Sequence, residues 1–215
     1  MTGVKTVSDD PYRRVAGIYD RLFESMNRGL RVLGTRMLPP QPGMSVLDVG
    51  CGTGAHLEVY RQAGCDLHGI DTSPAMLDIA RNRLGDAADL HLGDATDMPF
   101  ADDSVDLAFS MFVLHEMDHD IRLATLGEMK RVIKPDGHIL LIDFHAGRAR
   151  PLKGWIVKPM IFLTELTAGG RHFRNYRHFI SIRGLPTLIA ASELDQQKMK
   201  IVAGSCLALH LVQAR

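Results

Sequence analysis

VLDVGCGTG, residues 46–54, is the stretch from which the architecture of this chain follows. Its short apolar run, rich in β-branched residues, predicts a buried strand, and glycines at 50, 52 and 54 come directly after it. These glycines allow a tight turn, the close approach of a ligand and the start of a helix, whose pattern continues to Gly64. A strand, a glycine loop and a helix in this order are typical of nucleotide-binding folds, although an ordinary tight turn also has this composition.

Strand-like and helical patterns alternate along the rest of the chain. Strand-like runs occupy residues 45–49, 67–70, 90–92, 105–111 and 139–144, and helical patterns occupy 10–38, 54–64, 73–84 and 119–134. The residues KPDG at 134–137 predict a turn. The alternation predicts a parallel sheet with helices on both faces, and two strand-like runs at 198–203 and 207–214 predict an antiparallel hairpin. We therefore predict an α/β fold with a doubly wound, mostly parallel, seven-stranded Rossmann-like sheet, a C-terminal antiparallel hairpin and a helical lid insertion.

The composition excludes several classes of protein. The 215 residues are 46% hydrophobic and 23% charged, which excludes a disordered, collagen-like or disulfide-stapled chain. Three scattered cysteines without a CxxC pair favour a reducing compartment. The N-terminus carries acidic residues where a signal peptide needs an apolar core, and no apolar run is long enough to cross a bilayer. We therefore expect a cytoplasmic protein.

The net charge of zero is the sum of an acidic segment and basic segments of the sequence. Residues 41–144 hold seven basic and 18 acidic residues, whereas residues 145–185 hold eight basic residues and one acidic residue. Such asymmetry bears on binding partners rather than on the fold. The acidic centre favours a cationic ligand.

Two carboxylates stand where the predicted strands end. Asp71 ends the second strand, 21 residues after Gly50, where a carboxylate can accept hydrogen bonds from both ribose hydroxyls, and Asp94 follows the third strand, near the place of an adenine edge. Each acid alone is also a common capping or turn residue. The loop itself is GxGxG rather than GxGxxG, and Asp48 precedes it by two residues. A carboxylate there repels a pyrophosphate and suits an ammonium-bearing ligand.

Four segments together resemble a known family. VLDVGCGTGAHL, GIDTSPAMLDIAR, GDATDMPFADDSVDLAFSMFVLHEM and EMKRVIKPDGHILLIDF resemble, in order, the motifs of class I S-adenosylmethionine-dependent methyltransferases. The resemblance covers residues 46–144 and looks closest to the type 11 group, which includes the ubiquinone/menaquinone methyltransferases. Tyr19-Asp20 is similar to the opening of that group and of small phospholipid N-methyltransferases.

The resemblance implies S-adenosylmethionine as the cofactor and assigns residues to it. Asp48 and the glycine loop would hold its methionine part, Asp71 its ribose, and Asp94 with Ala95 the adenine edge. Met76 would pack near the adenine, Ser110 and Met111 would lie near the sulfonium, and Tyr19 would close over the cofactor. The complete set implied is Tyr19, Asp48, Gly50, Cys51, Gly52, Gly54, Asp71, Thr72, Met76, Asp94, Ala95, Ser110 and Met111.

The chemistry depends on the acceptor. Methyl transfer to an amine or a phenolate needs little beyond proximity and orientation, but a quinol carbon or a neutral hydroxyl needs a base. His115, just past the fourth strand, is the predicted base, with His145 as the second candidate. The alternative is that His115 packs under the cofactor and donates a hydrogen bond.

Other classes of protein remain open. Residues 115–119, HEMDH, satisfy the HExxH pattern of zinc hydrolases, but that pattern needs a continuous helix and a third ligand, so we predict no metal. A nicotinamide-dependent oxidoreductase would bind NADH instead of S-adenosylmethionine. A third alternative is a relative that binds the cofactor without catalysis.

The basic segment after residue 144 is predicted to supply the acceptor. Its apolar residues share one helical face with a kink at Pro159, and they are Leu152, Trp155, Ile156, Met160, Leu163 and Leu166. Lysines and arginines surround this face within residues 148–183. The face either packs on an acceptor pocket or rests on an anionic membrane surface. No nucleic acid is expected, since the basic stretch is short and the chain is neutral.

We therefore expect one methyltransferase domain over residues 1–215. Its parts are a helical cap (1–44), a cofactor-binding core (45–144), a helical lid and acceptor region (145–192) and a terminal hairpin (193–215). The expected acceptor is a small, amphipathic or lipid-like molecule such as a quinol, and the alternative is a phospholipid ethanolamine head group. The expected location is cytoplasmic, at or near the inner face of the membrane.

Overall fold

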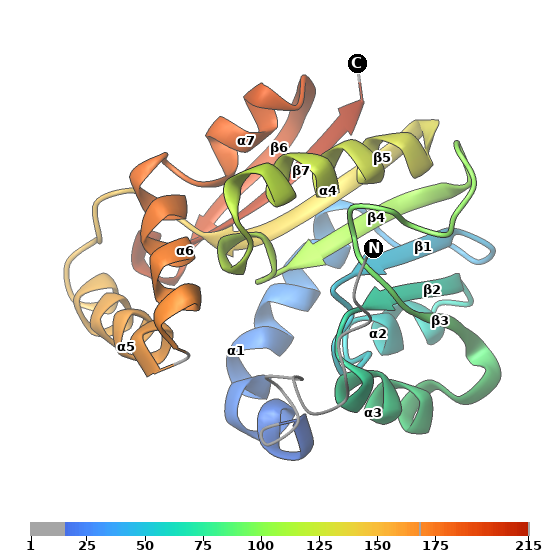
Figure 1. Cartoon of the computed structure of the whole chain (residues 1–215), viewed down its shortest axis with the longest axis horizontal. Helices are drawn as coiled ribbons and strands as arrows, with labels where there is room; N and C mark the ends of the chain where they lie inside the picture. The colour runs from blue at the N-terminus through green and yellow to red at the C-terminus, as the bar shows by residue number, and fades with distance from the viewer. Residues whose placement is uncertain (1–15, 168, 215) are drawn as a thin grey trace, which may run out of the picture.

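The computed structural model describes residues 16–167 and 169–214, and the side chains of 27–166 and 169–214. Its centre is a seven-stranded sheet in the order β3-β2-β1-β4-β5-β7-β6 (Figure 1). The strands are β1 (Ser45–Val49), β2 (Asp66–Asp71), β3 (Ala88–Leu92), β4 (Val105–Met111), β5 (Ile133–Phe144), β6 (Leu194–Val202) and β7 (Leu207–Ala214). The first five are parallel, and β7 is antiparallel to both β5 and β6. The predicted fold class is confirmed.

Helices cover the sheet and extend beyond one end of it. They are α1 (Ala16–Met37), α2 (Leu57–Arg61), α3 (Pro74–Leu84), α4 (His119–Val132), α5 (Lys153–Thr167), α6 (Gly170–Ser181) and α7 (Leu185–Ala191), with short 3₁₀ turns η2 (Gly85–Ala87), η3 (Leu114–Glu116) and η4 (Ala203–Ser205). In Figure 1, α5 and α6 lie beyond the end of the sheet toward which the arrowheads of β1 and β4 point. Ligands bind at this carboxyl end in parallel α/β sheets.

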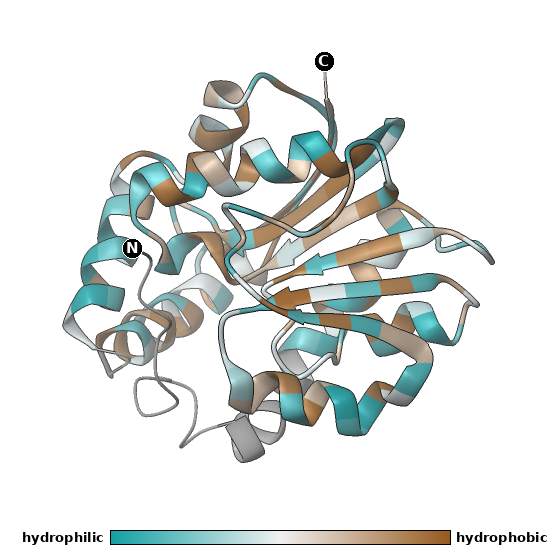
Figure 2. Ribbon diagram, turned by 45° about the vertical axis from the view of Figure 1, so that its right-hand side comes forward, coloured by the Kyte–Doolittle hydropathy of each residue, from teal (hydrophilic) through white to brown (hydrophobic). Residues whose placement is uncertain are grey.

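The core sits on the central strands. Apart from Ser45, every residue of β1 is buried, and the last six residues of β5 are buried as well. A strand covered on both faces needs a continuous apolar run rather than an alternating one, which is why these segments carry Val, Leu and Ile in succession. Figure 2 shows apolar residues gathered on the strands of the sheet and polar residues on the outward faces of the helices.

Three local predictions differ from the structure. The helical pattern at 54–64 shortens to α2, because turns precede and follow it. The predicted turn at 134–137 lies within β5, where pairing jumps from Val105 opposite Ile133 to Leu107 opposite His138. The intervening residues form an irregularity that Lys134 ties to Asp106, with 2.9 Å between Nζ and Oδ1. The start expected at residue 10 for the first helix lies outside the described residues.

The terminal hairpin is confirmed and contains a buried histidine. His210 on β7 is fully buried, and its Nδ1 lies 2.7 Å from Oε1 of Gln196. Burial, helped by His145, lowers the pKa of His210 to about 4. The unfolded chain binds this proton near pH 6.5, so stability falls as the pH drops below 6.5 toward 4.

Replacing His210 with glutamine should flatten this acid sensitivity. We expect His210 to contribute a loss of about 1.4 kcal/mol in the free energy of unfolding per pH unit below 6.5, a loss that His210→Gln lacks. Urea unfolding at pH 7, 6 and 5 measures it. His91→Gln, a half-exposed histidine on the edge strand β3, is the control and should keep the slope of the unmodified protein. Equal slopes for all three proteins would contradict the assignment.

Candidate cofactor and acceptor site

The glycine loop has the geometry that the sequence predicts. Gly50, Gly52 and Gly54 adopt φ values of +77°, +52° and +72°, which favour glycine. The backbone N–H of Gly50 donates to the carbonyl of Ile70, with 2.8 Å between N and O, so the loop is anchored on β2. A Cβ added at Gly52 would meet nothing within 4 Å, whereas one at Gly50 would come within 2.5 Å of Val113. The backbone at Gly52 is therefore open to a ligand.

Asp71 connects the loop to the start of α3. Its Oδ2 accepts the backbone N–H of Gly52 and its Oδ1 accepts that of Ser73, each with 2.8 Å between nitrogen and oxygen. An ionised carboxylate has about four acceptor positions, so it can accept hydrogen bonds from backbone N–H groups and from a ligand hydroxyl together. Thr72, predicted beside it, is exposed. Asp71 therefore shapes the loop in addition to any role in binding.

Asp48 lies beneath the same loop. It is 3% exposed, and burial raises the pKa of its carboxyl well above the usual range, with Asp71 adding to the rise and Arg31 on α1 opposing it. The pKa of the neighbouring Cys51 thiol is raised in the same way, by burial and then by Asp48 and Asp71. A cationic group brought to this position would favour the charged form of Asp48. The site therefore fits the ammonium group of a methionine moiety.

Of the residues predicted for the adenine and sulfonium ends, Met76 lies in the first turn of α3, Asp94 and Ala95 follow β3, and Ser110 lies near the end of β4. Met76 and Ala95 are buried, and Asp94 is exposed, where its Oδ1 accepts the N–H of Thr96 at 2.9 Å. Ser110 at the end of β4 is buried, and its Oγ has no hydrogen-bond partner among the described residues. An unpartnered buried hydroxyl fits a ligand that supplies the missing partner.

Met111 and Tyr19 are two further residues predicted to bind the cofactor. Met111, which follows Ser110, is half-buried at the end of β4. Tyr19 is in α1, outside the residues whose side chains the structure describes. Of the other assigned positions, Asp48 lies in β1 and Ser110 in β4. The rest lie in the loop after β1, at or just after the end of β2, at the start of α3 and in the segment after β3.

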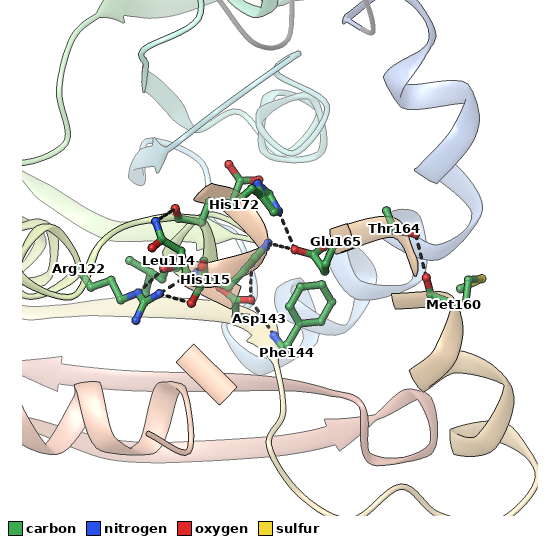
Figure 3. Close-up of polar contacts among 11 residues, drawn as sticks. Leu114, His115, Arg122, Asp143, Phe144, Met160, Thr164, Glu165 and His172 are labelled. Atoms are coloured by element: carbon green, nitrogen blue, oxygen red, sulfur yellow. Dashed lines mark hydrogen bonds and ion pairs between the residues drawn. The ribbon is translucent and has the colours of Figure 1, made fainter. Parts of the chain in front are cut away.

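His115 lies in a second polar cluster, shown in Figure 3, between the end of β4 and the lid helices. It is 2% exposed, its Nδ1 lies 2.8 Å from Oδ1 of Asp143 on β5, and its Nε2 lies 3.5 Å from Oε2 of Glu165 on α5. His172 on α6 completes the cluster, with 2.6 Å between its Nε2 and the same Glu165 oxygen. Residues far apart in the sequence therefore meet at one buried point.

The neighbouring carboxylates determine the protonation state of His115. Burial alone would lower the pKa of this imidazole, but Asp143, followed by Glu116 and Glu165, raises it to about 9. The group therefore holds a proton at neutral pH before any ligand arrives. The role of His115 as a general base stays a prediction. It requires that another group first removes this proton, because a protonated imidazole cannot accept one. His145, the second candidate, is half-buried outside the cluster, and burial lowers its pKa.

The zinc-hydrolase geometry of HEMDH is absent. The 3₁₀ turn η3 ends at Glu116, Met117 is extended at φ −81° and ψ 154°, and Asp118 is the N-cap of α4. His115 and His119 are consequently not one turn apart on a helix, as HExxH zinc binding requires. His119 instead contacts the ring of His178.

Arg122 joins this cluster to the lid and was not predicted from the sequence. Its side chain is fully buried; Nε donates to the carbonyl of Leu114 at 2.7 Å, and one terminal nitrogen donates to the carbonyls of His115 at 3.2 Å and Asn175 at 2.7 Å. Asn175 in turn donates to the carbonyl of Glu116 at 2.7 Å. An arginine on a helix ordinarily indicates a solvated face, so the only available signal was its position shortly after His115.

Comparisons with known proteins agree with this geometry. A family model described as a methyltransferase domain matches residues 47–141. The chain is 39% identical over 130 residues to a malonyl-[acyl-carrier protein] O-methyltransferase of Pectobacterium atrosepticum, covering 60% of this chain and 49% of that protein. It is 36% identical over 141 residues to a demethylmenaquinone methyltransferase of Renibacterium salmoninarum, covering 66% and 58%. The chain thus spans about half the length of these relatives.

A further relative aligns over nearly its whole length, and solved structures share the fold. The ubiquinone/menaquinone biosynthesis C-methyltransferase UbiE of Burkholderia multivorans is 29% identical, covering 97% of this chain and 96% of that protein. Geranyl diphosphate C-methyltransferase of Streptomyces coelicolor, solved with Mg²⁺, geranyl diphosphate and S-adenosyl-L-homocysteine, superposes with a TM-score of 0.64 at 16% identity, covering 89% and 82%. We therefore identify residues 47–141 as a methyltransferase domain.

Proposed function

We propose that the protein transfers the methyl group of S-adenosylmethionine to a small amphipathic acceptor, with a quinol as the first candidate. The observation that carries the proposal is the loop at Gly52, which Asp71 anchors above the buried Asp48. The quinone methyltransferases among the relatives support the acceptor class, and one of them aligns over nearly its full length. Methylation of a phospholipid ethanolamine head group is the alternative.

The residues of this chain hold and orient the cofactor. S-adenosylmethionine supplies an activated methyl group on a sulfonium. Asp71 accepts ribose hydroxyls, Asp48 faces the ammonium group, and the Ser110 hydroxyl is available to the ligand at the end of β4. Such positioning accounts for most of the rate of an in-line displacement, because the entropy cost of bringing two reactants together is met by binding before the chemical step.

A turnover assay tests the acceptor. The protein is incubated with S-adenosylmethionine and, separately, with demethylated quinols, phosphatidylethanolamine, catechols and small amines, and S-adenosylhomocysteine is quantified. We expect the quinols to give the largest increase over the rate without acceptor. Turnover of phosphatidylethanolamine alone would replace the quinol with the alternative, and no increase with any acceptor would contradict the proposal.

The outer face of α5, the first helix of the lid, is relevant to how an amphipathic acceptor reaches the protein. The predicted apolar residues Leu152, Trp155, Ile156, Met160, Leu163 and Leu166 are between 49% and 79% exposed. Pro159 lies inside α5, and the buried Ile161 and Glu165 face the domain. Among the residues whose side chains the structure describes, this apolar face therefore points away from the domain rather than into a pocket. No helix among the described residues is both long and apolar enough to span a bilayer.

Exposed basic residues lie close to this face in the sequence. Lys153 and Lys158 lie on α5, and the other exposed basic residues of the segment 148–183 are Arg148, Arg150, Arg171, Arg174, Arg177 and Arg183. An apolar face framed by lysine and arginine is typical of helices that rest on anionic membranes, and each basic residue near such a surface contributes about 1 kcal/mol. We propose that α5 docks on the anionic cytoplasmic membrane surface and receives a lipid-soluble acceptor there.

Vesicle binding should therefore depend on charge. Cosedimentation with anionic vesicles is expected at low salt and should decrease as salt rises. The paired substitution Lys153→Glu and Lys158→Glu should reduce it about tenfold or more, since it reverses two favourable charges. Trp155 is the one tryptophan of the chain, and its emission should shift to the blue on binding.

A matched control changes the same charge elsewhere. Lys130→Glu with Lys200→Glu, on α4 and β6, should leave vesicle binding nearly unchanged. If the unmodified protein stays in the supernatant with anionic vesicles at low salt, the docking proposal is wrong and the acceptor is a dissolved molecule.

A further inference from the structure

Four side chains with metal-binding atoms converge where the lid meets the domain. His115 and Glu116 come from η3, Glu165 from α5 and His172 from α6, as Figure 3 shows for the labelled members. The ligand atoms of His115, Glu116 and His172 all lie within 4.8 Å of one another. Oε2 of Glu165 lies 3.5 Å from Nε2 of His115 and 2.6 Å from Nε2 of His172.

We propose that this cluster binds one divalent transition-metal ion through Nε2 of His115, Nε2 of His172 and the carboxylate of Glu165. Glu116 faces the other ring nitrogen of His172, with 3.9 Å between its Oε1 and Nδ1. Two imidazoles with one or two carboxylates form a donor set that suits zinc, and also iron or manganese. Ligand atoms about 2.0–2.1 Å from a shared tetrahedral ion lie about 3.4 Å apart. The 3.5 Å separation between His115 and Glu165 matches this spacing, and the shorter contact between Glu165 and His172 must open for the ion.

The surroundings hold the proposed ligands in place. Asp143 accepts the Nδ1–H of His115, so Nε2 is the nitrogen that faces Glu165 and His172. A carboxylate behind a histidine in this way is the usual arrangement at metal sites, where it fixes the ring and strengthens the ligand. Arg122 fixes the backbone carbonyl of His115, and Asn175 fixes that of Glu116. The cluster is therefore held from β5, α4 and α6.

The site differs from the HExxH pattern in the sequence. That pattern pairs His115 with His119, whereas here the second histidine is His172, which lies 57 positions further along the chain. Metal binding through HExxH would require His119 and not His172, whereas the cluster proposed here requires His172 and not His119. Variants at these two positions therefore distinguish the two sites. Without an ion, the same groups would be a network of hydrogen bonds and ion pairs, and that is the other outcome of the test.

Metal titration of the untagged full chain tests the proposal. After treatment with a chelator, Zn²⁺, Co²⁺ and Mn²⁺ are titrated separately by calorimetry, and the visible absorption of Co²⁺ reports its coordination. We expect one ion per chain for at least one metal. His172→Ala and Glu165→Gln should each weaken binding at least tenfold, since even loss of an outer partner at metal sites has that effect.

His119→Ala is the matched control and should leave the affinity unchanged. Circular dichroism shows whether each variant is folded, and titration with S-adenosylmethionine is run in parallel. The metal proposal does not depend on the methyl acceptor, so intact cofactor binding with no metal binding would overturn it alone. Metal binding that survives both His172→Ala and Glu165→Gln would place the ion elsewhere and would also overturn it.

Discussion

Replacing Asp71 with alanine should weaken S-adenosylmethionine binding at least tenfold. The variant loses the proposed acceptors for the ribose hydroxyls, and charge-assisted hydrogen bonds contribute about 1.5–3 kcal/mol each. It also loses the acceptors for the N–H groups of Gly52 and Ser73, so the loop that faces the ligand is less fixed. Isothermal titration calorimetry measures the change.

Two further variants separate binding from folding. Asp78→Ala removes an exposed carboxylate of α3 that forms an ion pair with Arg81, and the variant should bind the cofactor like the unmodified protein. Asp71→Asn keeps one acceptor oxygen and should fall between the alanine variant and the unmodified protein. An Asp71→Ala protein that is folded and binds with unchanged affinity would contradict the ribose assignment.

Replacing Arg122 with methionine should lower the free energy of unfolding by about 3 kcal/mol or more. Methionine has a similar length but donates no hydrogen bond, so the carbonyls of Leu114, His115 and Asn175 lose the donor that Arg122 supplies, and of these the Leu114 carbonyl keeps the N–H of Met117 at 3.3 Å. Each buried unsatisfied polar group costs about 1–3 kcal/mol. The cation–π contact with Phe179, 5.3 Å from the guanidinium carbon to the ring centroid, is lost as well.

Urea unfolding monitored by circular dichroism measures this loss. Lys130→Met, on the same helix and only partly buried, is the control and should change the free energy of unfolding by about 0.5 kcal/mol or less. If Arg122→Met costs less than about 1 kcal/mol, the carbonyls have other partners and Arg122 does not hold the lid to η3.

The glycine loop could be predicted because its signals are local. The apolar run before Gly50 and the glycines that adopt positive φ lie within residues 46–54, and Asp71 stands 21 residues after Gly50, at the end of the next strand. The parallel sheet then brings its strand ends together, since the carboxyl ends of parallel strands share one edge. The roles of Met76 and Ser110 are predicted only from the resemblance to the methyltransferases.

The cluster around His115 could not be predicted, because its members are joined by tertiary packing. Glu165 was visible as the lone acid of a basic segment, but helical periodicity alone did not show that it faces inward while Trp155 and Leu163 face outward. His172 and Arg122 lie on different helices, and no spacing in the sequence relates them to Asp143. The break between α5 and α6 also escaped prediction, although Gly169 and Gly170 stand at that position.

Titration of the unmodified protein with S-adenosylmethionine and, separately, with NADH shows which cofactor the glycine loop binds. We propose one cofactor site at the loop of Gly50, Gly52 and Gly54, next to Asp48 and Asp71. We expect one S-adenosylmethionine to bind per chain and NADH to release no measurable heat of binding, because two acidic side chains give a pyrophosphate no positively charged partner. Binding of NADH with no binding of S-adenosylmethionine would contradict this assignment.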